Sequence, residues 1–180
     1  MKGYKAFHWD MCCRPLLTPP MMYEIGETYR IPEMPVLCEK GFHFCREVIQ
    51  VYDWYAPTFD TRVCEVVASG DVVEGPFPPK LATNCLTVVR ELTPKEILGF
   101  LHTEGTFGSN SVRRNMLDSV ASFYKLPERY VLWGFNSSTS RTPSEREIHR
   151  LRERADEWWE LLKELFQELL EESKLEEAEK

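Results

Sequence analysis

The run LCEKGFHFC at residues 37–45 carries the residue types best suited to chemistry. His43 has a side chain that titrates near neutral pH, so it could act as a general base or contact a ligand. Because side chains alternate along a strand, His43 should face away from Phe42 and Phe44. The alternative is that His43 is only a polar side chain on a half-exposed strand.

The same run contains three potential metal ligands, Cys38, His43 and Cys45. Together with Cys12 or Cys13 from the first loop, they could form a tetrahedral zinc site. Their spacings match no standard zinc module, so we predict neither a metal nor a cofactor. No export signal is visible at the N-terminus, so the six cysteines are expected to be reduced thiols in the cytoplasm.

A second possible site is a pocket lined by aromatic side chains with polar ends. The N-terminal half contains Tyr4, Tyr23, Tyr29, Tyr52, Trp54 and Tyr55. Such rings could stack on a nucleobase or a nicotinamide, although aromatic residues at strand and helix spacing more often belong to the core. The candidate ligand-binding residues are Tyr4, Lys5, His43, Cys45 and Tyr52.

A third possible site is the stretch GTFGSNS at residues 105–111, which precedes a predicted helix. Backbone N–H groups at a helix N-terminus attract anions, and two arginines follow in the first turns. The stretch lacks the lysine of a phosphate-binding P-loop, so an ordinary loop is the alternative. The candidate anion-binding residues are Ser109, Asn110, Arg113 and Arg114.

Composition limits the possible partners. The chain has 180 residues, of which 43% are hydrophobic, and no apolar run is long enough to span a membrane. Its net charge is −7, and from Ser144 onward 13 acidic and 7 basic residues give −6 of that charge. The first 143 residues are therefore nearly neutral, which argues against binding to nucleic acid.

The pattern of elements predicts an α+β fold with a small mixed or antiparallel sheet. Strands are expected at 4–7, 27–31, 42–45, 62–68, 86–89 and 130–135, and helices at 46–55, 93–102 and 112–124. Thr93 and Glu96 form a capping box around Pro94, which marks the start of a short helix. The predicted organisation is an α+β domain over 1–135, a linker over 136–142, an amphipathic helix over 143–175 and a frayed tail over 176–180.

The C-terminal helix should begin at a second capping box, Thr142 to Glu145. Apolar residues then recur at alternating steps of three and four, which is a heptad pattern. The residues expected to meet a partner are Leu151, Trp158, Leu162, Leu165 and Leu169. This face could fold back onto the helix containing Met116 and Phe123, or it could pair with another chain, which would be self-association.

Several short motifs carry a family resemblance. They are KGYKAF at residues 2–7, YEIGETY at 23–29, LCEKGFHFC at 37–45, TRVCEV at 61–66 and VRELT at 89–93. In this order they resemble a domain family common in bacteriophages, prophages and Gram-positive bacteria, over about residues 1–98. The resemblance implies no particular activity.

A more distant resemblance is to the NAD-binding half of ADP-ribosyltransferases. In those enzymes an Arg or His on the first strand and an aromatic-Ser-Thr-Ser strand hold NAD, and a later Glu carries catalysis. Lys5 lies near the first of these positions and His43 lies within the second. No Ser-Thr-Ser follows His43, and no Glu-x-Glu pair follows on a later strand, so the catalytic set is incomplete.

The sequence therefore favours a small cytoplasmic binding protein of phage or prophage type, present in the host cytoplasm if a phage encodes it. It would act by occupying a protein of the host cell or of its defence system. The alternative is an ADP-ribosyltransferase-like enzyme, or a binder of an NAD or nucleotide type of ligand.

Overall fold

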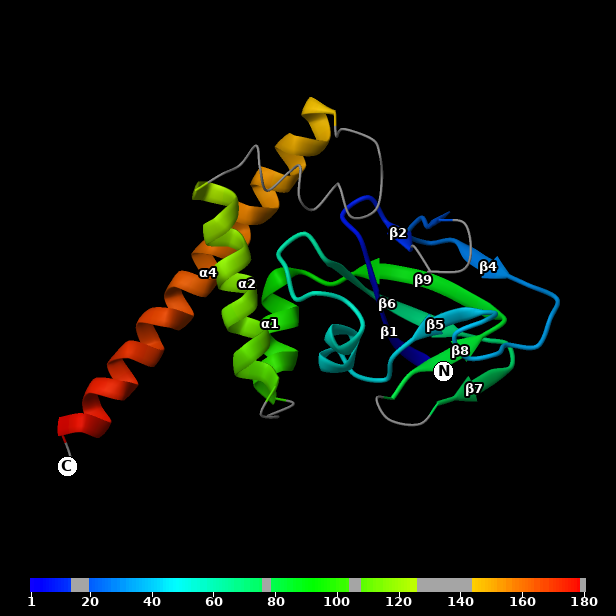
Figure 1. Ribbon diagram of the computed structural model, residues 1–180, viewed down its shortest axis with the longest axis horizontal. Helices are drawn as coiled ribbons and strands as arrows, with labels where there is room; N and C mark the ends of the chain where they lie inside the picture. The colour runs from blue at the N-terminus through cyan, green and yellow to red at the C-terminus, as the bar shows by residue number, and fades with distance from the viewer. Residues whose placement is uncertain (14–19, 76–78, 104–107, 126–143, 179–180) are drawn as a thin grey trace.

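The computed structural model describes residues 1–13, 20–75, 79–103, 108–125 and 144–178 (Figure 1). Along the chain its elements are β1 (Lys2–Phe7), β2 (Cys12–Cys13), β3 (Met21–Met22), β4 (Thr28–Arg30), β5 (Phe42–Phe44), the 3-10 helix η1 (Ile49–Asp53), β6 (Arg62–Ala68), β7 (Val72–Glu74), β8 (Leu81–Thr83), β9 (Cys85–Glu91), α1 (Pro94–Thr103), α2 (Gly108–Lys125) and α4 (Glu145–Ala178). Within the helices, the side chains of 102–103, 108–110, 123–125, 165–166 and 168–178 lie outside the described residues. The α+β class is confirmed.

Antiparallel pairing builds the sheets. The main sheet has the order β1-β6-β9-β4, a second sheet has the order β5-β8-β7, and β2 pairs with β3. The two larger sheets meet where Tyr4 and Cys45 exchange backbone hydrogen bonds of 2.8 and 2.7 Å. Gly3 permits this approach, since a Cβ there would lie 2.5 Å from the Cys45 carbonyl oxygen. The predicted strands at 4–7, 27–31, 42–45, 62–68 and 86–89 are present, and 130–135 lies outside the described residues.

The helix predicted over 46–55 is wrong, because this segment forms only the short 3-10 helix η1. The side-chain oxygen of Gln50 accepts hydrogen bonds from the backbone N–H groups of Arg46 and Glu47, both at 3.2 Å. The segment is also rich in β-branched and aromatic residues, which lose side-chain freedom in an α-helix. Local side-chain bonding and low propensity together limit the helix to one or two turns.

The capping box predicted for α1 is confirmed. The Glu96 N–H donates to the Thr93 hydroxyl at 3.2 Å, and the Thr93 N–H donates to the Glu96 carboxylate at 2.9 Å. Arg90 also donates to Glu96, at 2.9 Å. These contacts hold the start of α1 against the end of β9.

The start of α4 differs from the prediction by two residues. The capping box is formed by Ser144 and Glu147, with the Ser144 N–H donating to the Glu147 carboxylate at 2.8 Å. Thr142 and the predicted linker lie outside the described residues. At its other end α4 continues to Ala178, beyond the predicted end at 175. Similarly, α2 already begins at Gly108, so residues 108–111 form its first turn and not a loop.

The main sheet has a different core on each face. On β1, Ala6 belongs to the cluster that packs against the helices, whereas Phe7 belongs to the cluster on the opposite face. Val63 and Cys64 divide in the same way on β6. The alternation of a strand therefore separates a helix-covered face from a face covered by the second sheet (Figure 1).

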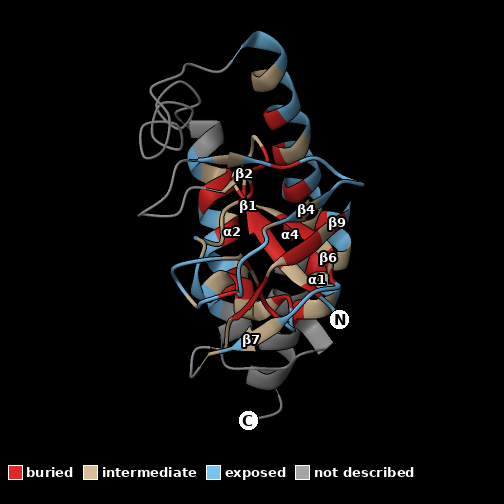
Figure 2. Cartoon of the chain, turned by 90° about the vertical axis from the view of Figure 1, so that its right-hand side faces the viewer, coloured by how far each residue is buried: buried red, intermediate tan, exposed pale blue. Residues whose placement is uncertain are grey.

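The apolar side of α4 lies inside the first of these cores. Leu151, Ala155, Trp158 and Leu162 are buried in the cluster that contains Ala6, and Figure 2 shows buried positions on the side of α4 turned to the sheet. Leu151, Trp158 and Leu162 thus fold back onto their own chain and do not present an open partner surface. The side chains of Leu165 and Leu169 lie outside the described residues.

A shared carboxylate attaches α4 to the sheet. One oxygen of Glu91 accepts a hydrogen bond from Arg154 on α4 at 2.8 Å, and the other accepts two from Arg62 on β6. Arg154 also donates to the carbonyl oxygens of Phe59 at 2.7 Å and Thr61 at 3.2 Å. This network fixes the position of α4 along the sheet. No helix in the described part of the chain is apolar over a length sufficient to cross a bilayer.

Adjacent tryptophans on α4 test this packing. Trp158 is fully buried, whereas Trp159 is 37% exposed. We expect Trp158→Ala to lower the free energy of unfolding by about 3–5 kcal/mol, because it leaves a cavity in the shared core. Trp159→Ala should cost about 1 kcal/mol or less. Urea denaturation of both variants measures the difference, and equal losses would contradict the described orientation of α4.

Candidate functional site

The strand β5 carries the predicted histidine in the predicted orientation. Phe42 and Phe44 are buried on one side of the strand, and His43 is half-buried on the other. The Nε2 atom of His43 accepts a hydrogen bond of 2.9 Å from the backbone N–H of Cys38. The neutral imidazole therefore carries its proton on Nδ1, and its acceptor nitrogen is already in use. This contact favours a positioning role for His43 over that of a general base.

The group that His43 positions is a tight turn over residues 36–40. Val36 and Lys40 exchange backbone hydrogen bonds of 2.9 and 2.8 Å across it. Cys38 has a φ of +63°, a left-handed conformation that costs energy in a residue other than glycine. Gly41 follows with a φ of +103°. The hydrogen bond from Cys38 to His43 helps to offset the strain at Cys38.

The environment of His43 disfavours its charged form. The pKa of His43 is lowered to about 4, chiefly by burial and additionally by the positive charges of Lys80 and Lys5. A charged His43 would also need a proton on Nε2, where it now accepts a hydrogen bond. His43 is therefore neutral at physiological pH.

An exposed patch lies beside this turn. The Lys80 ammonium is 4.1 Å from the centre of the Trp54 ring and 4.0 Å from the Cys38 sulfur. Trp54 is 40% exposed, and Val36 in the same turn is also exposed. We name this surface, formed by Val36, Cys38, Trp54 and Lys80, the Trp54 patch. This surface presents an aromatic ring, an aliphatic side chain, a thiol and a cation.

The predicted ligand-binding residues do not form one open pocket. Lys5 is buried and donates to the His43 carbonyl oxygen at 2.9 Å, so these two residues do come together. Tyr4 points to the helix side, where its ring meets Phe100 at 5.5 Å. Cys45 is buried, and this burial raises the pKa of its thiol to about 11. The set is divided between the two faces of the sheet.

Tyr52, the remaining predicted ligand-binding residue, lies in the core beneath the helices. Its hydroxyl is buried without a hydrogen-bond partner in the described part of the chain. Burial raises the pKa of Tyr52, although the positive charge of Arg154 opposes the shift. Its position is that of a core residue with a polar end.

The predicted anion-binding residues all lie on the first turns of α2. Arg114 is exposed and Arg113 is half-buried, and Arg113 Nε has no hydrogen-bond partner among the described residues. The side chains of Ser109 and Asn110 lie outside the described residues. An anion site at this helix end stays a prediction.

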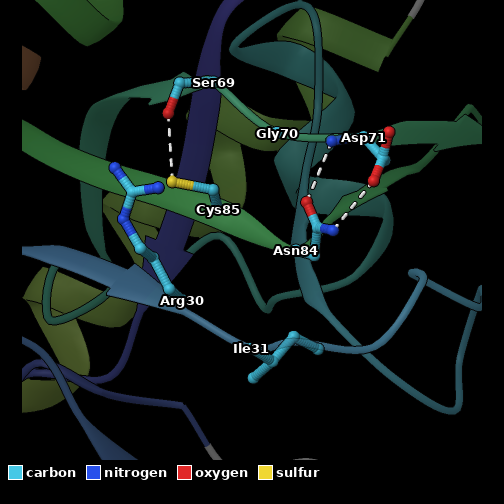
Figure 3. Close-up of a pocket in the computed structure, with 7 residues that line it drawn as sticks. All are labelled: Arg30, Ile31, Ser69, Gly70, Asp71, Asn84 and Cys85. Atoms are coloured by element: carbon cyan, nitrogen blue, oxygen red, sulfur yellow. Dashed lines mark hydrogen bonds between the residues drawn. The ribbon is translucent and has the colours of Figure 1, made fainter.

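A recess that sequence reasoning missed lies at the turn that connects β6 to β7, strands of different sheets. It has a volume of about 470 Å³ and is lined by Arg30, Ile31, Ser69, Gly70, Asp71, Asn84 and Cys85 (Figure 3). Asn84 accepts a hydrogen bond from the Asp71 N–H at 2.9 Å and donates to the Asp71 carboxylate at 3.0 Å. Gly70 is needed for this contact, because a Cβ there would lie 2.0 Å from the Asn84 oxygen. The only signal in the sequence is the Ser-Gly-Asp turn.

The chemistry of this recess is limited. The Ser69 hydroxyl and the Cys85 sulfur are 3.0 Å apart, but no histidine lines the recess to activate either group. Arg30, Ser69 and Asp71 are exposed, so the recess is open to solvent. In the described part of the chain, no three His, Cys, Asp or Glu side chains are grouped to hold a metal ion.

Comparison with known proteins places the sheets in a family. The model of the family described as Domain of unknown function (DUF7666) matches residues 1–99, more than half of the chain. The chain belongs to this family. The DUF7666 match includes β1 to β9 and ends within α1, so α2 and α4 lie outside it. No curated protein and no solved structure matches the chain.

The pKa of His43 predicts a pH dependence of stability. Between about pH 6.5 and 4 the unfolded chain binds a proton at His43 that the folded chain does not, so stability falls as the pH falls. The slope from this group cannot exceed about 1.4 kcal/mol per pH unit. His43→Gln keeps an acceptor for the Cys38 N–H but does not titrate, so it should flatten this slope.

Urea denaturation at pH 7, 6, 5 and 4 measures the effect. His149→Gln, which removes an exposed histidine on α4, is the matched control. If the wild type and His43→Gln lose stability in parallel, His43 is not buried as described.

Proposed function

We propose that this chain is a small binding protein that acts by occupying a protein partner, with the Trp54 patch as the contact surface. The resemblance of residues 1–98 to phage and prophage domains supports a setting in the cytoplasm of a host cell, where the partner belongs to the host or to its defence system. The observation that carries the proposal is an exposed tryptophan beside a rigid, strained turn.

The composition of the patch supports protein recognition. Trp is the residue most typical of binding hot spots, and Met is enriched in interfaces. Trp54 is supported by its contact with Lys80, and Met34, which is 61% exposed, lies two residues before Val36. Exposed apolar side chains of this size lower the solubility of a protein. A partner that covers them would remove this disadvantage.

The rigidity of the turn also supports binding. Its two backbone hydrogen bonds and the contact from Cys38 to His43 define one conformation before any partner is present. A preformed surface loses less conformational entropy on association than a mobile one. The strain at Cys38 is thus compatible with a role in recognition.

The contacts of Lys5 and His43 argue against the ADP-ribosyltransferase-like alternative. That activity needs the side chains at these two positions to face an open nicotinamide pocket. Lys5 is instead buried, and the acceptor nitrogen of His43 is bonded to the turn. A binding protein requires neither group to be free.

Affinity capture from the natural host tests the proposal. Tagged wild-type protein should retain a specific partner, and Trp54→Ala should reduce its retention by tenfold or more, the effect of losing a hot-spot side chain. Trp159→Ala, which removes a partly exposed tryptophan from α4, should retain the partner fully.

Two outcomes would overturn the proposal. One is a partner whose retention depends on Trp159 and not on Trp54. The other is calorimetric binding of NAD by the wild type that is lost in His43→Gln, which would support the enzyme-like alternative.

A further inference from the structure

The second face of the main sheet contains a buried lysine. Lys5 is 5% exposed and lies on β1 directly opposite Cys64 of β6. Its ammonium donates a hydrogen bond to the His43 carbonyl oxygen at 2.9 Å and lies 5.3 and 5.7 Å from the centres of the Phe7 and Tyr23 rings. No carboxylate pairs with Lys5 in the part of the chain that the structure describes. A buried ammonium normally has such a partner.

The remaining neighbour of the amine is a thiol. Lys5 Nζ lies 3.7 Å from the sulfur of Cys13 on β2. The Cys13 sulfur also lies 3.2 Å from the hydroxyl of Tyr55. Burial raises the pKa of Tyr55, so its hydroxyl keeps its proton at neutral pH and can donate it to the sulfur. The sulfur is therefore held between a phenol and an amine.

Three features of this pair suit a covalent reaction. The two atoms are already in contact, and the strands that carry them are held in place by pairing with β6 and β3. Cys13 is only half-buried, which leaves a path for a small oxidant. The amine lies beside two aromatic rings, and no ion pair with another described residue has to be broken for it to react.

We propose that dioxygen links Lys5 Nζ and Cys13 Sγ through one bridging oxygen atom, so that the pair is an oxidative modification site. The ammonium first releases a proton. The amine and the thiol then each lose one hydrogen, and an N–O bond and an O–S bond form. Dioxygen accepts four electrons, two from nitrogen and two from sulfur. One of its oxygen atoms stays in the bridge, and the other leaves as water.

The link joins β2 to β1 at residues eight positions apart. It converts a buried cation into a neutral group, which removes the cost of an unpaired charge in the core. A dithiol reductant reverses the reaction by supplying four electrons, which restores the amine and the thiol and releases the bridging oxygen as water. The modification is independent of whatever the Trp54 patch binds.

Peptide mapping of the full-length protein tests the proposal. Trypsin cannot cleave after a modified lysine, and it does not cleave the Arg14-Pro15 bond, so air-exposed protein should give an uncleaved peptide of residues 3–30, heavier by about 14 Da. Further cleavage after Phe7 should leave the two halves joined. Treatment with dithiothreitol should restore both cleavage at Lys5 and the unmodified mass.

Three variants complete the experiment. Lys5→Arg keeps the charge and Cys13→Ser keeps the size, and the mass increase should be absent in both. Cys64→Ala, which removes the thiol opposite Lys5, should retain it. The wild-type peptide map decides the question even if a Lys5 variant fails to fold.

A gain of about 16 Da on Cys13 with normal cleavage at Lys5 would show simple oxidation of the thiol and would overturn the proposal. A disulfide between cysteines in the same peptide would overturn it equally, and so would a mass increase that persists after dithiothreitol.

Discussion

The fold depends on one carboxylate shared by two arginines. Glu91 ends β9, and it binds Arg62 of the neighbouring strand and Arg154 of α4 through different oxygens. Arg154 also donates to two backbone carbonyls, so each of its three guanidinium nitrogens makes a hydrogen bond. Such a half-buried network adds little net stability over apolar packing, but removing Glu91 would leave two partly buried guanidinium groups without their carboxylate. Its main effect is to fix where α4 lies, one turn before Trp158 enters the core.

Features that depend on contacts between neighbouring residues were predicted from the sequence. The capping box at Thr93 and Glu96 can be recognised from four consecutive residues. The alternation of buried and half-buried side chains around His43 can be recognised from three. The same logic failed by two residues at α4, where Thr142 and Ser144 both begin a plausible box and the helix uses the second. Propensity explains the error at η1, where the apolar spacing of a helix is carried by residues that favour strands.

The remaining features depend on contacts between distant parts of the chain. Cys13 and Tyr55 are 42 positions apart, and Glu91 and Arg154 are 63 positions apart. No pattern within either segment marks its partner. The sequence identified Lys5 and His43 as candidates, but it gave no sign that a backbone N–H would occupy the imidazole. That contact requires the left-handed conformation of Cys38, which glycine usually adopts.

The end of the DUF7666 match at residue 99 falls inside α1, which runs from Pro94 to Thr103. The apolar face of the family's sheet is covered here by α2 and α4, which lie beyond that point. The segment that the family pattern matches is therefore shorter than the segment whose side chains share this core. A family member with a different C-terminal region must cover the same face with other side chains. The inner residues of this sheet therefore pack against helices that the family pattern does not include.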